Sequence, residues 1–333
     1  MNTVTLGVIG AGRIGKLHAE NIMKMPEAYL KMITDPYMDD AWAENHGLKV
    51  APDIETILSD DEIEGVFILS PSTLHAEQII QAARAGKHIF CEKPIALDPD
   101  IIINVLNVVE EQGVKLQVGF NRRFDPDFKR LKQAVDCGKI GRLYFIKITS
   151  RDPAPPPLEY IQSSGGIFLD MTIHDFDMVR YLSGSDVYEV YAAGAVLIDQ
   201  VFADAGDVDT AVTTLKLKSG ALAVIDNSRQ AVYGYDQRIE VFGSKGSITA
   251  ENNTATRTIL TVSEGVISDK PLDFFLERYR ESYRVEIQEF VRAIREDLET
   301  PVSGIDGLKP ILIGRAAQRS LDEGKPIKVE QID

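Results

Sequence analysis

The sequence holds few of the features that mark disulfide scaffolds, metal centres or membrane segments. Its 333 residues include two cysteines, Cys91 and Cys137, whose separation matches no metal-ligand spacing. No apolar run approaches the roughly eighteen residues that cross a bilayer. The chain does not open on a charged segment followed by an apolar one, as a secretory signal would. We therefore expect a protein of the reducing cytoplasm that binds neither a metal nor a membrane.

Basic residues are outnumbered by acidic residues. The chain has 36 Lys and Arg residues against 51 Asp and Glu residues, which gives a formal net charge of -15. Nucleic acids and anionic lipids bind clustered lysine and arginine, so this balance argues against both as partners. What is present, 44% hydrophobic and 26% charged residues, is typical of a soluble globular protein. A chain of 333 residues exceeds one ordinary core, so two domains are expected.

The first candidate site is a glycine-rich turn near the N-terminus. An apolar, β-rich run at residues 3–9 is followed by Gly10-Ala11-Gly12-Arg13-Ile14-Gly15 and then by helical spacing. Gly10 permits a tight turn, Gly12 lets the backbone approach a pyrophosphate, and Gly15 lets helix and strand pack closely. The N–H groups at the start of the helix would face the phosphates. The pattern predicts a dinucleotide site.

The nature of the dinucleotide is indicated by the second strand. The strand expected at residues 30–34 is followed directly by Asp35. An acid that binds the adenosine ribose is expected at this position. Pro36 and Tyr37 follow, and neither can bind a 2′-phosphate as arginine or lysine would. NAD is therefore favoured over NADP. The alternative is that Asp35 is a turn residue before a proline.

Alternating strands and helices continue to about residue 120. Residues 65–69 are entirely apolar, as in a buried parallel strand, and polar residues follow at 70–75. A strand at 87–91 runs into Glu92-Lys93-Pro94. Repeated βα units predict a Rossmann domain, a doubly wound parallel sheet with helices on both faces, over residues 1–120.

Ligands of such sheets bind beyond the C-terminal ends of the strands. Lys93 follows a strand directly, so its ammonium could hydrogen-bond a substrate hydroxyl and stabilise developing alkoxide character. The alternative is a surface lysine before a proline. His75 is a further candidate for the cofactor pocket. The residues assigned to the cofactor are Gly10, Gly12, Arg13, Ile14, Asp35, Ser70, Ser72, His75, Glu92 and Lys93.

Residues 121–333 carry a different pattern. Strands are expected at 143–149, 187–197, 210–218, 221–225, 237–242, 247–250 and 256–262, and amphipathic helices at 273–296 and 307–323. Strands of period two joined by short turns predict an α+β domain with a large, mostly antiparallel open sheet. A sheet with one uncovered face predicts a homo-oligomer built sheet to sheet, and we expect the oligomer to be a tetramer.

A candidate catalytic stretch runs from Asp170 to Asp177 in this second domain. Gly165-Gly166 precedes it and apolar residues follow, which favours a glycine loop leading into a helix. On one helix, Asp170, His174 and Asp177 would lie on the same face. A histidine beside carboxylates suits proton transfer near neutral pH. The alternative is a solvated helix face with chance acids.

These motifs together resemble the glucose–fructose oxidoreductase / inositol dehydrogenase / rhizopine catabolism (Gfo/Idh/MocA) family. The resemblance rests on the glycine turn, on Glu92-Lys93-Pro94, on residues 119–124 and on Asp170-x-x-x-His174. Residues 150–157, 165–177 and 233–240 are similar to bacterial myo-inositol 2-dehydrogenases.

The resemblance implies roles for single residues. Lys93 would bind the nicotinamide ribose and the reacting hydroxyl, His174 would be the catalytic base, and Asp170 would orient the substrate or the histidine. The residues implied to line the polyol pocket are Arg122, Asp152, Asp177 and Tyr235. Ser150 departs from the pattern, because some inositol dehydrogenases carry a second histidine there, and this puts the polyol preference in doubt.

The implied function is NAD-dependent oxidation of a ring CH–OH of a cyclic polyol, myo-inositol to 2-keto-myo-inositol (scyllo-inosose). One alternative is the same fold acting on another inositol isomer or a sugar. Others are a non-catalytic dinucleotide-binding regulator and an NAD-dependent glycosidase. Retention of Lys93, Asp170 and His174 argues against the regulator.

Overall fold

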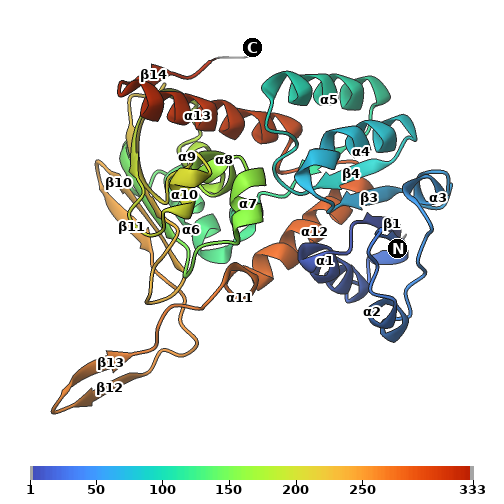
Figure 1. The fold of residues 1–333 in the computed structure, drawn as a ribbon, viewed down its shortest axis with the longest axis horizontal. Coiled ribbons are helices and arrows are strands. Elements are labelled where there is room, and N and C mark those ends of the chain that lie inside the picture. The colour runs from blue at the N-terminus through green and yellow to red at the C-terminus, as the bar shows by residue number, and fades with distance from the viewer. Residues whose placement is uncertain (1–2, 331–333) are drawn as a thin grey trace. The chain divides into compact units, whose positions relative to one another are not determined.

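A computed structural model describes residues 3–330 of the chain (Figure 1). They form two compact units, each built around its own sheet. The first unit comprises the residues up to Asn121 together with Glu281–Ile311. The second comprises Arg122–Arg280 and the residues from Leu312 onward. Within residues 3–330, no helix combines the length and the apolar character needed to cross a membrane.

The first unit contains a five-stranded parallel sheet in the order β2-β1-β3-β4-β5. Its strands are β1 (Val4–Ile9), β2 (Ala28–Thr34), β3 (Gly65–Ile68), β4 (His88–Cys91) and β5 (Leu116–Val118). The connecting helices are α1 (Arg13–Met23), α2 (Asp40–Asn45), α3 (Ile54–Leu58), α4 (Ser72–Arg84) and α5 (Pro99–Gln112). All residues of β3 are buried, as expected for a central parallel strand. The predicted Rossmann sheet is confirmed.

Helix α12 (Arg280–Arg295) completes this unit although it comes late in the sequence. Three of its apolar residues lie in the same hydrophobic cluster as residues of β1 and β2: Ile287, Phe290 and Val291. The Phe290 ring also meets Phe67 of β3 edge to face, with centroids 5.4 Å apart. The sequence-based division assigned all of residues 121–333 to the second domain. Residues 281–311 instead join the first, because the apolar face of α12 covers its sheet.

The second unit contains a seven-stranded sheet in the order β11-β10-β6-β9-β8-β7-β14. Its strands are β6 (Leu143–Arg151), β7 (Val187–Ala195), β8 (Thr210–Leu217), β9 (Leu222–Ser228), β10 (Asp236–Gly243), β11 (Gly246–Ala250) and β14 (Ile327–Lys328). Every pairing is antiparallel except that of β6 with β9. Burial alternates along β8, so one face of the sheet covers a core and the other is open. The predicted mostly antiparallel sheet is confirmed.

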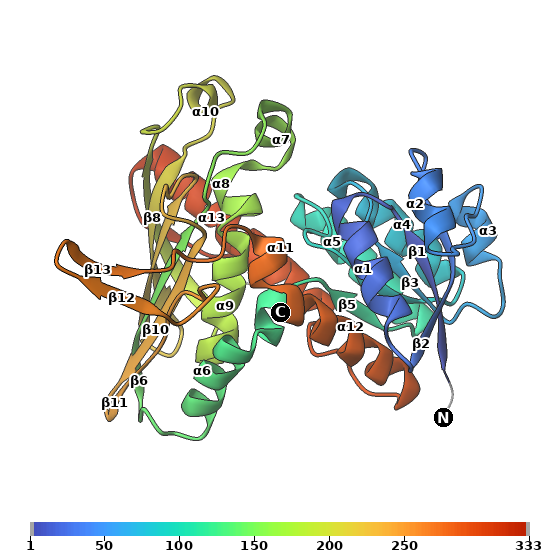
Figure 2. The same ribbon diagram turned by 90° about the horizontal axis from the view of Figure 1, so that it is seen from below.

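Helices of the second unit lie on one side of its sheet (Figure 2). Its helical segments are α6 (Pro126–Asp136), α7 (Leu158–Ser163), α8 (Gly166–Asp170), α9 (Ile173–Ser183), α10 (Val201–Asp204) and α11 (Phe275–Arg278), with all but the first residue of a 3-10 helix (Asn121–Phe124) and the part of α13 (Gly304–Glu323) from Leu312 onward. The buried side of α9 includes Ile173, Phe176 and Val179, which were expected to face a core. These three residues anchor α9, which carries the candidate base His174.

Two predicted elements differ in the structure. The single helix expected over 273–296 is divided into α11 and α12, because the backbone of Tyr279 leaves the helical region (φ -109°, ψ 17°) and its ring is buried. The strand expected at 256–262 is the shorter β12 (Ile259–Val262). It pairs with β13 (Gly265–Ser268) in a separate two-stranded ribbon and adds nothing to the main sheet.

Candidate active site

The glycine turn of the first unit has the geometry expected of a pyrophosphate site. Gly10 has a φ of +103°, and a Cβ added there would lie 2.6 Å from the carbonyl carbon of Leu69. A Cβ on Gly15 would lie 2.1 Å from the Gly10 oxygen. Gly12 is exposed, and a Cβ there would meet nothing within 4 Å. The backbone is therefore packed on its inner side and open where a phosphate would approach.

Asp35 braces this turn from the end of β2. One carboxylate oxygen accepts the Ala11 N–H at 2.6 Å, and the other accepts the Tyr37 N–H at 2.7 Å. The contact with Tyr37 is the one expected of a turn residue before a proline. The contact with Ala11 joins Asp35 to the glycine turn. Arg13 and Ile14 open α1, and no side chain caps its first turn. The donors and the acceptor that a dinucleotide needs are thus grouped at one edge of the sheet.

His75 links two loops at the same edge. Its Nδ1 lies 2.8 Å from the carbonyl oxygen of Pro94, and its Nε2 lies 2.8 Å from that of Ser70. Burial lowers the pKa of His75, and the neutral ring carries one N–H, so one ring nitrogen donates to its carbonyl while the other only contacts the second carbonyl. The Ser70 hydroxyl donates to Gln78 at 2.5 Å, and Ser72 is the first residue of α4. His75 therefore holds the backbone of the site.

Glu92 and Lys93 follow β4 directly. Lys93 is partly exposed, and the peptide bond between it and Pro94 is cis. The Glu92 carboxylate turns inward, where one oxygen lies 3.1 Å from Nε2 of His18. Glu92 and Lys93, both assigned to the cofactor, are each partly exposed.

In the second unit the candidate catalytic stretch is not one helix, which corrects the prediction. Asp170 is the last residue of α8, and His174 is the second residue of α9. At the break the Met171 and Thr172 N–H groups both donate to the Ile167 carbonyl, at 3.1 and 2.9 Å, and the Thr172 hydroxyl lies 2.8 Å from Oδ1 of Asn227. Asp170 therefore lies on a different helix from His174 and Asp177, which stand three residues apart on α9. His174 is partly exposed, whereas Asp170 and Asp177 are buried.

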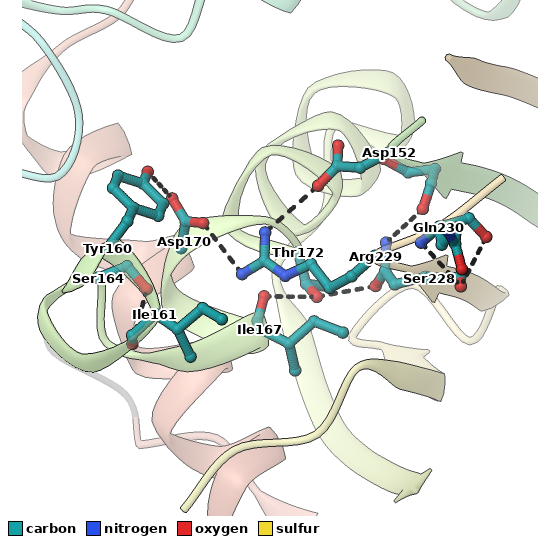
Figure 3. A network of polar contacts seen from close by, with 12 residues as sticks. Asp152, Tyr160, Ile161, Ser164, Ile167, Asp170, Thr172, Ser228, Arg229 and Gln230 are labelled. Carbon is teal, nitrogen blue, oxygen red and sulfur yellow. Dashed lines mark hydrogen bonds and ion pairs between the residues drawn. The ribbon is translucent and has the colours of Figure 1, made fainter. Parts of the chain in front are cut away.

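Asp170 is held by two donors (Figure 3). The Tyr160 hydroxyl donates to Oδ1 at 2.6 Å, and Nη2 of Arg229 donates to Oδ2 at 3.0 Å. Nη1 of the same arginine donates to Asp152 at 3.3 Å. Burial raises the pKa of Asp152, Arg229 opposes that shift, and the charge of Asp170 adds to it. Arg229 therefore orients two of the residues that were assigned to substrate.

The acids of α9 are taken by two other arginines. Asp177 accepts Nε and Nη2 of Arg123 at 2.8 and 2.6 Å, in a buried bidentate pair. Asp175 accepts Nη1 of Arg122 at 2.6 Å and the amide of Asn227 at 2.9 Å. Asp177 thus anchors α9 to the segment before α6, although it was predicted to line the polyol pocket.

Ser150 lies at the centre of the network around Arg122. Its hydroxyl is within 3.5 and 3.4 Å of the two Nη atoms of Arg122, and it donates to Gln237 at 3.1 Å. Tyr279 lies under the guanidinium at 5.6 Å and meets Tyr235 edge to face at 6.1 Å. Burial raises the pKa of Tyr235 well above its ordinary value, so its hydroxyl stays protonated. Arg122, Ser150 and Tyr235 are thereby brought together.

Comparison with known proteins decides the family. Residues 4–120 match an oxidoreductase family with an NAD-binding Rossmann fold, and residues 128–249 match the GFO/IDH/MocA C-terminal domain. The chain belongs to the Gfo/Idh/MocA oxidoreductase family. The predicted family, an oxidoreductase with an NAD-binding Rossmann domain, is confirmed.

Relatives of this family member extend over its whole length. It is 51% identical to the uncharacterized oxidoreductase YrbE of Bacillus subtilis, over 99% of this chain and 98% of that protein. It is 49% identical to the myo-inositol 2-dehydrogenase of Thermotoga maritima, over 98% of this chain and 99% of that protein. A crystal structure of scyllo-inositol dehydrogenase from Lactobacillus casei, with bound NAD(H) and scyllo-inositol, has a TM-score of 0.92 at 33% identity. That match covers 98% of this chain and 99% of the other.

Sequence reasoning assigned no role to three residues that contact the candidate site residues: Tyr160, Arg123 and Arg229. Arg229 is 59 residues from Asp170, so no local spacing connects them. The structural cause is the one parallel pairing of the second sheet, in which Arg151 pairs with Ser228. Asp152 and Arg229 each follow one of these paired residues, so they emerge side by side. A sequence pattern that predicted the parallel pairing of β6 with β9 would have predicted the contact between Asp152 and Arg229.

Proposed function

We propose that this protein oxidises a ring CH–OH of an uncharged cyclic polyol with NAD+, and that the polyol is myo-inositol, oxidised to 2-keto-myo-inositol. The observation that carries the proposal is the charge balance of the polar network in the second unit. Its charged members are Arg122, Arg123 and Arg229 with Asp152, Asp170, Asp175 and Asp177. These three cations and four anions leave no excess positive charge for a phosphorylated or carboxylated substrate. Their hydrogen-bonding atoms suit hydroxyl groups instead.

His174 is assigned the role of base. It is the partly exposed residue at the start of α9, with buried residues on both sides of it. A histidine titrates near neutral pH and can remove a hydroxyl proton while the carbon-bound hydrogen leaves as hydride. Bound NAD+ supplies the hydride acceptor, the nicotinamide C4.

Lys93 is assigned to the reacting hydroxyl. Its place directly after β4 puts its backbone at the edge of the sheet where ligands of parallel sheets bind. An ammonium group there stabilises negative charge that develops on the oxygen as the proton departs. Glu92 and His75 fix the backbone on either side of it through Lys93 N–H and the Pro94 carbonyl.

Asp170 and Asp152 are assigned to substrate hydroxyls. Each is oriented by Arg229, so their positions are set before a ligand binds. The identity of the isomer rests on relatives: one is named for myo-inositol and the other was crystallised with scyllo-inositol. Initial rates with NAD+ on myo-, scyllo- and D-chiro-inositol, glucose and xylose test the proposal. Oxidation of none of them, with NAD+ still bound, would contradict it.

We also propose a tetramer built through the open face of the second sheet. Phe145 on β6 pairs with Leu222 on β9 and with Phe242 on β10, and the last two are 44% and 45% exposed. The β12–β13 ribbon exposes further large apolar side chains: Ile259, Leu260, Val262, Val266 and Ile267. Both are apolar surfaces of the kind that a second copy of the chain would cover. Two free cysteines, Cys91 and Cys137, suit the proposed cytoplasmic location.

A further inference from the structure

Three ionisable side chains from three separate elements meet inside the first unit. His18 lies on α1, Glu92 follows β4, and Glu286 lies on α12. Nε2 of His18 is 3.1 Å from Oε1 of Glu92 and 3.9 Å from Oε1 of Glu286. The side chains of His18 and Glu286 are fully buried, and that of Glu92 is 16% exposed. None of these contacts is explained by the roles assigned so far.

The surroundings of this cluster are apolar. The His18 ring lies 5.2 Å from the Phe90 ring and 5.7 Å from the Tyr283 ring. Among the residues that the structure describes, Nδ1 of His18 and both carboxylate oxygens of Glu286 have no hydrogen-bond partner. Buried polar atoms without hydrogen-bond partners lower the stability of the fold. Proteins keep such atoms mainly at functional sites.

Glu92 connects the cluster to the backbone of Lys93. While Oε1 faces His18, Oε2 accepts the Lys93 N–H at 3.3 Å. Gly119 leaves room for this arrangement, since a Cβ there would lie 3.0 Å from both Cδ and Oε2 of Glu92. The Glu92 N–H is fixed in turn by the Ile68 carbonyl at 3.1 Å. The Glu92 carboxylate therefore has one side on α1 and the other on Lys93.

We propose that His18 and Glu286 are positioning residues for Lys93, and that they act through the carboxylate of Glu92. The inference rests on the proposed function, because it concerns the residue assigned there to the reacting hydroxyl. Nε2–H of His18 donates to Glu92 and holds the carboxylate against the Lys93 amide. Glu286 packs behind His18. Burial raises the pKa of Glu286 well above its ordinary value and the charge of Glu92 adds to the shift, so Glu286 brings a proton and no second negative charge.

A divalent cation is the other occupant that this geometry allows, because the three ligand atoms lie within 4.8 Å of one another. Two observations favour a protonated Glu286 over a bound cation. The cluster offers three ligands, fewer than a structural zinc takes. Nδ1 of His18 also lacks the second-shell partner that metal-bound histidines have. Elemental analysis of the purified chain settles the point, and a stoichiometric divalent cation lost in His18→Leu would overturn the proposal.

The kinetic test compares His18→Leu, which removes the donor, with His18→Gln, which keeps an N–H donor. We expect His18→Leu to lower kcat for the polyol by about 10- to 100-fold with the NADH Kd within about threefold of wild type. His18→Gln should recover most of the lost kcat. His46→Gln is the control, an exposed histidine at the end of α2 whose Nδ1 lies 2.8 Å from the Trp42 carbonyl oxygen. Wild-type kcat in His18→Leu, or a loss confined to NADH affinity, would overturn the proposal.

A second readout does not depend on turnover. The rate at which an amine-acylating reagent modifies Lys93 is followed by peptide mass spectrometry, with Lys16 as the internal reference. We expect His18→Leu to change the Lys93 rate by at least about threefold relative to Lys16, and His18→Gln to restore it. Equal rates in wild type and His18→Leu would contradict the positioning role. If the wild type oxidises no polyol, the proposed function fails while this measurement still decides the role of His18.

Discussion

Arg229 and Asp170 form a buried ion pair in which Nη2 lies 3.0 Å from Oδ2, although the two residues are 59 positions apart. The other oxygen of Asp170 accepts the Tyr160 hydroxyl at 2.6 Å. The carboxylate is therefore oriented by donors from two other segments. A substrate hydroxyl would meet a preset acceptor, which lowers the entropy that binding must remove.

Substitution of Arg229 should damage both the fold and the site. Arg229→Met leaves Asp152 and Asp170 without their shared cation, and breaking a buried pair in this way costs about 3–5 kcal/mol. Arg229→Lys keeps the charge but not the two-pronged geometry, so we expect a folded protein whose kcat/KM for the polyol is about tenfold lower. Thermal unfolding and steady-state kinetics measure the two effects. Wild-type behaviour of both variants would remove Arg229 from the site.

Asp35 should determine the preference for NAD. Asp35→Ala removes the acceptor of the Ala11 N–H and the proposed partner of the ribose hydroxyls. We expect the NAD+ Kd to rise by about tenfold while the NADP+ Kd changes less, which narrows the gap between them. Asp53→Ala, at the N-cap of α3, is the matched control. Unchanged NAD+ affinity in Asp35→Ala would show that Asp35 does not contact the ribose.

Glu286 should make stability depend on pH. Its folded-state pKa is raised well above the ordinary 4.5, so above that pH the unfolded chain releases a proton that the folded chain keeps. The contribution of Glu286 to stability is therefore largest below its unfolded pKa and falls as pH rises toward the folded pKa. Glu286→Gln is neutral throughout, so its stability relative to wild type should increase with pH across this window. Urea unfolding at about pH 4 and about pH 8 measures the difference, and parallel curves would contradict a protonated Glu286.

The open sheet face should hold the proposed tetramer together. Leu222→Glu and Phe242→Glu place charges on two half-exposed positions that flank Phe145 on the open sheet face. We expect the double variant to give the mass of a smaller species in light scattering while keeping its thermal unfolding cooperative. Lys218→Glu, in the exposed turn between β8 and β9, serves as the control. An undiminished mass in the double variant would move the interface elsewhere.

Most of the first unit could be predicted from the sequence, because short local segments determine its strands, turns and helices. The glycine turn, the fully apolar β3 and Asp35 at the end of β2 each carry their own physical reason. The packing of α12 against the first sheet could not be predicted in this way. Its Ile287 and Phe290 fit any apolar surface, and only the tertiary structure shows that they cover β1 and β3.

The second unit shows where periodicity misleads. Asp170, His174 and Asp177 have helical spacing, but α8 ends at Asp170 and α9 begins at Ile173, and the two acids bind different arginines. Spacing in sequence cannot reveal a two-residue break between helices, because residues on both sides of the break keep the same spacing. Nor can it supply the arginines, because these come from the segment before α6 and from the end of β9.

The most direct test of the proposed function is NADH formation from NAD+ and myo-inositol by the wild type and by His174→Gln, with NAD+ binding measured in both. We predict oxidation by the wild type, and a kcat reduced by about 10²- to 10⁴-fold in His174→Gln at unchanged NAD+ affinity, as expected for loss of a general base. Near-normal turnover in the variant would remove His174 from the role of base. Absence of turnover in a wild type that binds NAD+ would contradict myo-inositol oxidation itself.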